Sequence, residues 1–307
     1  MGILVIGSLN MDMVVRTDRA PQAGETLMGR SFTLSPGGKG ANQAVAAARL
    51  GGDVTMAGTV GDDAFGRELR GIMEQEGIHT QYLRTSTSLP TGVASIVVEE
   101  SGENRILIVP GANLELSAGD LEGMEELITV ADLVVLQLES DYNMTVKAAV
   151  LAHKHGVPVI LNPAPAQEIG QEILPYITYL TPNETEVALM AGVPVQNPEE
   201  AEKAARILLG RGARHVIVTL GSKGALVVTE EGAEIIAGYP AKVVDTVAAG
   251  DSFNGALAVQ LAKGVTLREA VGFANAVGAL TVGREGAIPS LPDREETERF
   301  LRERAKV

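Results

Sequence analysis

The sequence contains no cysteine and no tryptophan among its 307 residues, and aromatic side chains make up only 3% of it. The lack of cysteine excludes disulfides, thiolate catalysis, thiolate zinc sites and iron–sulfur ligation. Basic residues are few as well, because 25 Lys and Arg against 39 Asp and Glu leave a net charge of −14. Such a surface repels nucleic-acid backbones and anionic lipid, and there are few aromatic side chains to stack on bases. We therefore expect no nucleic-acid partner and no membrane partner.

Long hydrophobic runs are absent too, since no apolar stretch approaches the roughly 20 residues that a membrane span needs. The apolar segment 3–6 has no basic flank of the kind that a signal peptide carries, and Asp12 follows soon after it. Hydrophobic residues at 45% are nevertheless enough for a globular core. These features predict a soluble cytoplasmic protein.

Short runs of Val, Ile and Leu alternate with longer Ala-rich stretches of helical period, which is typical of βαβ units and a largely parallel sheet. Buried strands are predicted at 3–7, 54–58, 133–136, 157–161 and 216–220, and helices at 40–49, 65–76, 143–155, 199–209, 250–263 and 267–282. Two further segments, approximately 13–34 and 91–110, have strand-like patterns without a partner helix. Length alone fits two domains or one large α/β domain with a small appendage equally well. We predict one α/β domain over 1–307, with a Rossmann-like, mainly parallel sheet flanked by helices and a small antiparallel sheet as a candidate lid. Surface hairpins that do not move are the alternative for these two segments.

Polar and glycine-rich segments follow the predicted strands, at the edge where open parallel sheets bind ligands. Asn10 and Asp12 follow the first strand, and an amide beside a carboxylate suits hydroxyl recognition, although a simple turn is the alternative. The segment 37–40 (GGKG) opens a helix, where glycine allows close approach and the helix dipole favours anionic or hydroxyl groups. A turn needed only for packing is the alternative there. Neither a phosphate-loop motif nor a dinucleotide-binding glycine motif is present.

A third segment, 244–255, places small residues before another predicted helix. The backbone amides of Ala248, Ala249 and Gly250 can point together at a developing anion. Asp251 then lies in the first helical turn, where it can accept a proton from an attacking hydroxyl. An acid that only complements the helix dipole is the alternative.

Two polar segments remain. Asn183 and Glu186 are one helical turn apart and can orient hydrated Mg²⁺, but the same spacing fits a helix N-cap. The segment 219–224 (TLGSKG) joins two apolar runs, where a hairpin turn and a nucleotide contact are both open.

Taken together, these segments resemble the ribokinase, or PfkB-type, family of carbohydrate kinases over essentially the whole chain. The most specific matches are 37–44 (GGKGANQA), 162–166 (NPAPA), 183–186 (NETE) and 245–251 (DTVAAGD). Departures are small: Ser252 stands where threonine is common, and Arg284-Glu285 stands where a second basic residue is often found.

The resemblance implies phosphorylation of a sugar hydroxyl by ATP, and our hypothesis for the acceptor is O5 of D-ribose. It implies that Asp251 is the general base and that Ala248, Ala249 and Gly250 form the anion hole. The positions matched to sugar binding are Asn10, Asp12, Gly38, Lys39, Asn42, Glu139 and Asp251. Those matched to the nucleotide are Asn183, Glu186, Thr219, Gly221, Gly224, Gly250 and Asn275, with Glu186 holding Mg²⁺ through water. Those matched to a monovalent cation, typically K⁺, are Asp245, Val247 (through its carbonyl), Thr281, Arg284, Gly286 and Ser290.

The resemblance also implies that the lid closes over the sugar and makes the contact of a homodimer. One alternative is another kinase of the family, acting on deoxyribose, fructose or a nucleoside. Asp12, Asn42 and Glu139 favour a small polyhydroxylated sugar, and the low aromatic content argues against a nucleoside. The second alternative is a sugar-binding relative without catalysis, for which a missing base or anion hole would be the signature.

Overall fold

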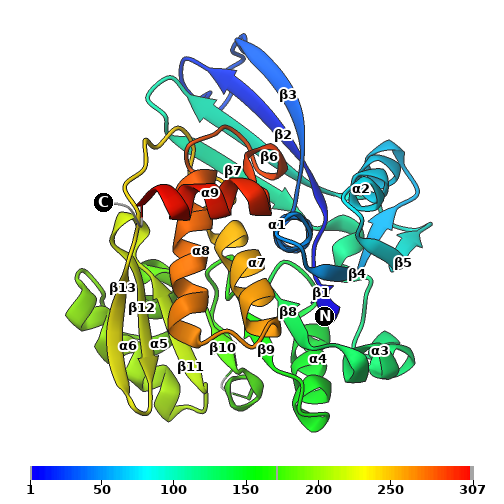
Figure 1. Ribbon diagram of the computed structural model, residues 1–307. Coiled ribbons are helices and arrows are strands. Elements are labelled where there is room, and N and C mark those ends of the chain that lie inside the picture. Colours follow the sequence, from blue (N-terminus) through cyan, green and yellow to red (C-terminus); the bar gives the residue numbers. More distant parts are fainter. Residues whose placement is uncertain (1, 171, 305–307) are drawn as a thin grey trace.

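The computed structural model describes residues 2–170 and 172–304, and this part of the chain forms one sheet of nine strands and one of four (Figure 1). The large sheet has the order β13-β12-β11-β10-β9-β8-β1-β4-β5. Neighbouring strands are parallel from β5 to β11, and β12 and β13 are added antiparallel at one edge. The strands are β1 Gly2–Ile6, β4 Asp53–Gly61, β5 His79–Ser86, β8 Leu133–Leu136, β9 Val159–Leu161, β10 Tyr179–Leu180, β11 His215–Thr219, β12 Gly224–Thr229 and β13 Gly232–Ala237.

Helices cover both faces of the large sheet, so that two apolar cores form, one on each side. Alternate residues of β1 point to opposite cores, because side chains alternate along a strand: Ile3 and Val5 join one, Leu4 and Ile6 the other. The first core contains side chains of α1 Lys39–Arg49, α2 Ala64–Gln75, α7 Ala249–Ala262 and α8 Leu267–Thr281, and α9 Arg294–Arg304 packs on α8. The second contains side chains of α3 Glu125–Val130, α4 Tyr142–Lys154, α5 Glu184–Ala191 and α6 Pro198–Gly210.

The predicted α/β class with a mainly parallel sheet is confirmed. Each predicted helix begins and ends within about one residue of the observed one, because the apolar period and the capping residues define the ends. Asp141, Asn197 and Thr266, for example, accept a first-turn N–H of α4, α6 and α8. In the described part of the chain, no helix is both long enough and apolar enough to span a membrane.

The small sheet lies beyond the carboxyl ends of β1 and β5, at the top of Figure 1. Its strands are β2 Asn10–Thr17, β3 Ser31–Gly37, β6 Gly92–Glu99 and β7 Asn104–Val109, in the order β3-β2-β6-β7. The outer pairs are antiparallel, but β2 and β6 pair in parallel, so the prediction of an antiparallel sheet was wrong for the central pair. The reason is topological: β2 continues from β1 and β6 from β5, and these two strands already run in the same direction.

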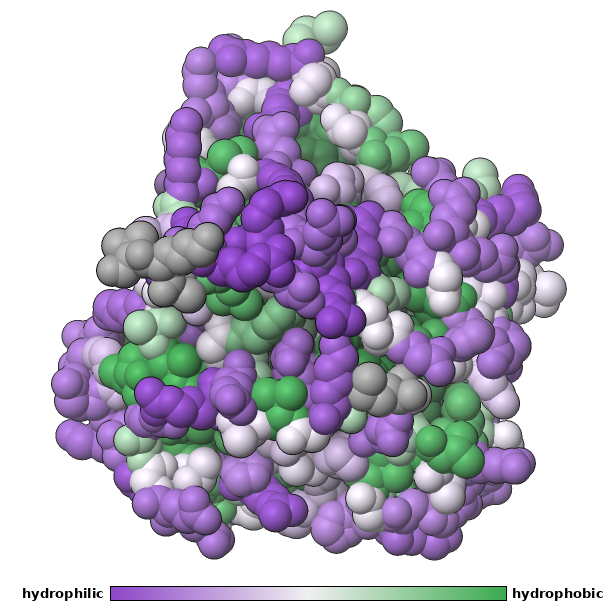
Figure 2. All heavy atoms as spheres, viewed as in Figure 1, coloured by the Kyte–Doolittle hydropathy of each residue, from purple (hydrophilic) through white to green (hydrophobic). Residues whose placement is uncertain are grey.

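Exposed apolar side chains are concentrated on the small sheet. Figure 2 shows hydrophobic residues at the surface at the top of the view, where this sheet lies, beside a largely hydrophilic surface. Phe32 on β3 is 57% exposed and Leu107 on β7 is 74% exposed, and Leu34 and Val109 are exposed as well. Burying such side chains is favourable, so this surface suits a contact with another apolar surface.

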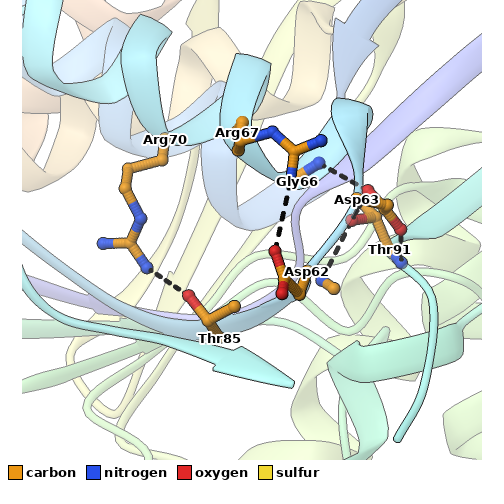
Figure 3. Close-up of polar contacts among 8 residues, drawn as sticks. Asp62, Asp63, Gly66, Arg67, Arg70, Thr85 and Thr91 are labelled. Carbon is orange, nitrogen blue, oxygen red and sulfur yellow. Dashed lines mark hydrogen bonds and ion pairs between the residues drawn. The ribbon is translucent and has the colours of Figure 1, made fainter. Parts of the chain in front are cut away.

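A compact hydrogen-bond network joins the small sheet to the large one where the chain enters β6 (Figure 3). The Asp63 carboxylate accepts from the Thr91 amide (2.8 Å) and hydroxyl (2.7 Å) and from the Gly66 amide (2.8 Å), which caps α2. Burial would raise the pKa of Asp63, but these donors outweigh it and hold that pKa below its usual value. Gly61 approaches so closely that a Cβ there would lie 2.4 Å from the Thr91 amide nitrogen. These contacts therefore hold three parts of the chain together: the end of β4, the start of α2 and residue Thr91, which directly precedes β6.

Candidate active site

Two adjoining cavities lie at the amino-terminal end of α7. The first, of about 350 Å³, lies between the carboxyl ends of the large sheet and the small sheet, which contributes Ile96, Ile106 and Ile108 to its wall. The predicted sugar, magnesium and base residues line it together: Asn10, Asp12, Gly38, Lys39, Asn42, Glu139, Asn183, Glu186 and Asp251. Ala248 and Gly250 of the predicted anion hole and Val247 of the predicted cation site line it as well.

The second cavity, of about 290 Å³, lies between the β11–β12 turn, the segment 238–243 and helices α7 and α8. Thr219, Thr246 and Gly250 line both cavities, so the two meet at the start of α7. The predicted nucleotide residues Gly221, Gly224 and Asn275 line the second cavity, and no described residue of its lining carries a charge. These walls suit an uncharged group.

The glycine-rich turn before α1 packs directly on the segment between β1 and β2. Gly38 caps α1 with φ at 90°, and a Cβ there would lie 2.7 Å from the Asn10 amide nitrogen. At Gly40 a Cβ would lie 2.6 Å from the Ser8 amide nitrogen. The alternative that these glycines are needed for packing is therefore correct. The same close approach brings Asn10, Lys39 and Asn42 to one cavity.

Asp251 is held by two amide side chains of α1 and is only 7% exposed. Asn42 donates from Nδ2 to Oδ2 (2.8 Å), and Gln43 donates from Nε2 to Oδ1 (2.9 Å). The carboxylate is thus oriented through both of its oxygens. Gln43 was not predicted from the sequence; the only signal was a second amide beside Asn42 in an otherwise apolar, buried stretch of helix.

The backbone before α7 adopts a conformation that is rare outside glycine. Ala248, the N-cap residue, has φ at 60°, which costs on the order of 1–2 kcal/mol for an L-residue. Such outliers cluster at functional sites, where the surrounding structure enforces them. The first-turn amides of a helix lack partners within the helix, and here they begin beside Asp251. Of the three predicted anion-hole amides, that of Ala249 makes a long bond of 3.3 Å to the Thr246 carbonyl.

Several predicted sugar residues are fixed by neighbours of their own. Asn10 accepts from the Asn113 side-chain amide (2.8 Å), a partner that the sequence did not indicate. Glu139 accepts from the Ser8 hydroxyl (2.6 Å) and from the Lys39 amide (3.0 Å). Asn42 differs, because its Oδ1 is buried and has no hydrogen-bond partner among the described residues. Since buried polar atoms are nearly always paired, this oxygen is available to a ligand hydroxyl.

The first cavity is acidic: the described residues lining it include four carboxylic acids and one lysine. Burial, reinforced by the charges of Glu139 and Asp251, raises the pKa of Asp12 to about 7. Burial also raises the pKa of Glu186. For Lys39 burial alone would lower the pKa, but the surrounding carboxylates, Asp251 foremost, outweigh it and raise that pKa. A neutral, hydroxyl-rich ligand suits these walls, whereas a polyphosphate would need an accompanying cation.

Asn183 and Glu186 form a capping box at the start of α5. The Asn183 side chain accepts from the Glu186 amide (2.8 Å), and the Glu186 carboxylate accepts from the Asn183 amide (2.8 Å). The helix-cap alternative is therefore correct, and both residues also line the first cavity. Among the described residues no cluster of three or more His, Cys, Asp or Glu side chains could hold a metal ion. A divalent cation beside Glu186 would thus need oxygen ligands from water and from a phosphate, as Mg²⁺ commonly has.

The turn after β11 and the residue Asn275 have structural roles as well. Strands β11 and β12 form an antiparallel hairpin through a short 3₁₀ turn, Gly221–Lys223, as the hairpin alternative predicted. Asn275 on α8 donates from Nδ2 to the carbonyls of Ile236 (2.9 Å) and Ala237 (3.2 Å), which fixes β13 to that helix.

The residues predicted for a monovalent cation lie in two segments, 245–247 and 281–290, and hydrogen bonds to the Asp245 side chain join these segments. Its carboxylate accepts from the amides of Val247 and Gly286, both at 3.0 Å. The remaining side chains bond within the protein: Thr281 donates to the Val277 carbonyl (2.9 Å), Ser290 donates to the Ala287 carbonyl (2.7 Å), and Arg284 pairs with Glu296. A cation here would therefore be held by the Asp245 carboxylate and backbone carbonyls, which are hard oxygen ligands.

Comparison with known proteins identifies the class. The model of the pfkB family of carbohydrate kinases matches residues 2–294, and the chain belongs to this family. It is 41% identical over 299 residues to a ribokinase of Haemophilus influenzae, with 97% of this chain and 98% of that protein covered. It is 37% identical over 302 residues to a deoxyribokinase of Salmonella typhi, with 98% and 99% covered. The structure of Arabidopsis thaliana ribokinase complexed with ribose and ATP superposes with a TM-score of 0.91 at 35% identity, with 97% and 98% covered.

Proposed function

We propose that this carbohydrate kinase transfers the γ-phosphoryl group of ATP to O5 of D-ribose, giving ribose 5-phosphate and ADP. One observation carries the proposal: Asp251, with both oxygens held by α1, lies where two cavities meet at the start of α7. The ribose hydroxyl gives its proton to the Asp251 carboxylate as its oxygen forms the new bond to phosphorus. The bond from phosphorus to the bridging oxygen of ADP breaks. The first-turn amides of α7 stabilise the charge on the transferring group.

The two cavities divide the substrates between them. The acidic first cavity takes the neutral sugar, whose hydroxyls donate to the oxygens of Asp12, Glu139 and Asn42. The uncharged second cavity takes the adenine and ribose of ATP, so that the phosphates extend past Gly250 toward Asp251. Asn183 and Glu186 would hold Mg²⁺ through water, which supplies neutralisation of the phosphate charge beside the carboxylates. Lys39 adds the positive charge that the chain itself contributes.

Two kinds of evidence support ribose as the acceptor: the relatives of the chain and the residues that line the first cavity. Ribokinases are among the relatives at about 40% identity, and one ribokinase structure contains ribose and ATP. Deoxyribose is the second candidate, because a deoxyribokinase is 37% identical over nearly the whole chain. The two sugars differ by one hydroxyl, and a site that bonds that hydroxyl rejects the sugar lacking it. The other relatives considered, fructose and nucleoside kinases, share the fold at 22–23% identity.

We propose further that the small sheet acts as a lid, and that its exposed apolar surface makes the contact of a homodimer. Phe32, Leu34, Leu107 and Val109 on that surface would be buried in such a contact. Lid closure would exclude water, which otherwise competes for the phosphoryl group. K⁺ binding at Asp245 and a location in the cytoplasm belong to the same proposal.

The test is a coupled ADP-release assay with ATP, Mg²⁺ and K⁺, run with ribose, deoxyribose, fructose, adenosine and no acceptor. A strong preference for ribose is the expected result. Preference for another acceptor would keep the mechanism and move the substrate. No turnover with any acceptor, while calorimetry still detects sugar binding, would favour the non-catalytic relative and overturn the proposal.

A further inference from the structure

Gln43 is the second amide that holds Asp251, and it differs from Asn42 in one respect. Asn42 lines the first cavity, whereas Gln43 is 0% exposed and does not line it. Gln43 therefore has no access to a substrate in that cavity. Any influence that it has on the reaction passes through Asp251.

The Gln43 side chain is held in one orientation by a chain of amides. Its Nε2 donates to Asp251 Oδ1 (2.9 Å) and lies 3.1 Å from Asn162 Oδ1, while its Oε1 accepts from Gln137 Nε2 (2.8 Å). The reversed orientation would place Oε1 against two oxygens and Nε2 against the Gln137 donor. Gln137 follows β8, and Asn162 follows β9, so two strands of the large sheet fix this side chain.

The room for this chain depends on the absence of a side chain at Gly7. A Cβ at Gly7 would lie 1.9 Å from Gln137 Oε1 and 3.1 Å from the Gly40 Cα. The amide chain is thus built into the contact between β1, β8 and α1. It connects the core of the large sheet to the carboxylate of the proposed base.

We propose that Gln43 is a positioning residue, which aims the Asp251 carboxylate at the reacting hydroxyl through the amide chain Gln137–Gln43–Asp251. The inference rests on the proposed function, because it assumes that Asp251 is the base. A carboxylate can rotate about its terminal bond; Asn42 holds only Oδ2, and the bond from Gln43 fixes the second oxygen, Oδ1. Proton transfer needs the base within hydrogen-bond reach of the hydroxyl in the correct direction, so a loosely held carboxylate lowers kcat rather than substrate affinity.

The experiment begins with ribose-dependent turnover of the wild-type enzyme, because its absence would refute the proposed function rather than this inference. Gln43→Met keeps the length and burial of the side chain and removes its hydrogen bonds. We expect kcat to fall about 10- to 100-fold, the range for a misplaced catalytic group, while ribose affinity by calorimetry changes less than about threefold. Gln137→Met breaks the same chain one residue further from Asp251, so kcat should fall there as well, but clearly less than in Gln43→Met.

The decisive comparison uses the Asp251→Ala background. If Gln43 acts through Asp251, adding Gln43→Met there causes no further loss of the residual rate. An equal loss in both backgrounds, or a kcat within about threefold of wild type in the single variant, would overturn the inference. Should Gln43→Met fail to fold by circular dichroism, Gln43→Asn keeps a polar amide but withdraws it from Asp251, and its results are judged by the same two criteria.

Discussion

Ribose affinity should depend on pH through Asp12. Burial and the charges of Glu139 and Asp251 raise the pKa of Asp12 from its ordinary value of 3.8 to about 7, so this side chain is largely protonated below neutral pH. An ionised carboxylate accepts two sugar hydroxyl bonds, whereas a protonated one must place its own hydrogen as well. Binding therefore favours the charged form and lowers the pKa of Asp12, and protons are released.

The magnitude follows from the fraction of Asp12 that is ionised. With a pKa of about 7, about nine-tenths of the Asp12 side chains are ionised at pH 8 and about one-tenth at pH 6. The apparent dissociation constant for ribose should therefore rise about tenfold when the pH is lowered from 8 to 6. Calorimetry at pH 6, 7 and 8, in buffers of different ionisation enthalpy, measures both the affinity and the proton release. Asp12→Asn should bind ribose more weakly at pH 8 and with little pH dependence. Equal affinity of the wild type at pH 6 and pH 8 would refute this reasoning.

The same shift predicts the direction of a stability effect. The folded protein holds the Asp12 proton up to about pH 7, whereas the unfolded chain loses it near pH 4. The free energy of unfolding that this proton contributes is therefore lost as the pH rises from about 4 to about 7. Asp12→Asn should then have a higher Tm than the wild type at pH 8, and a lower one would contradict the sign.

Four further predictions concern the base, the helix contact, the root of the small sheet and the cation. Asp251→Asn should lower kcat by ~10²–10⁴, the usual range for a positioned general base, with modest change in KM; near-normal turnover would remove the assignment. Gly255→Ala places a Cβ 2.6 Å from a side-chain atom of α1, so the free energy of unfolding should fall by ~1–3 kcal/mol and activity should fall as Asp251 moves away from α1. Gly71→Ala, in open space on α2, is the control and should leave stability unchanged or raise it. Asp63→Ala removes the cap of α2 and the bonds to Thr91; it should cost ~1–3 kcal/mol and raise the KM for ribose, and an unchanged Tm would contradict the network's role. Replacing K⁺ by Na⁺ should reduce turnover, and an indifferent enzyme would remove the proposed cation site.

The tertiary structure alone decided several elements that lack a sequence period. Helix α5 was not among the predicted helices because its polar residues all lie in its first turn and the rest are apolar, which leaves no amphipathic period. Helix α9 was missed because only Thr297 among its described residues is buried. Strand β10 has two residues, too few for any alternation to be read. The parallel pairing of β2 and β6 depends on how the large sheet is assembled, which no local pattern contains.

The sequence by itself determined the α/β class, the positions of six helices and the segments that surround the site. It could do so because apolar period, capping residues and glycine at tight contacts are local properties of the chain. It could not determine which side chains meet. Gln43 and Asp251 are 208 residues apart, and Asn10 and Asn113 are 103 apart, yet both pairs are hydrogen-bonded. Such pairs form only when packing of α1 on α7 and of the small sheet on the large one has fixed their distance and direction.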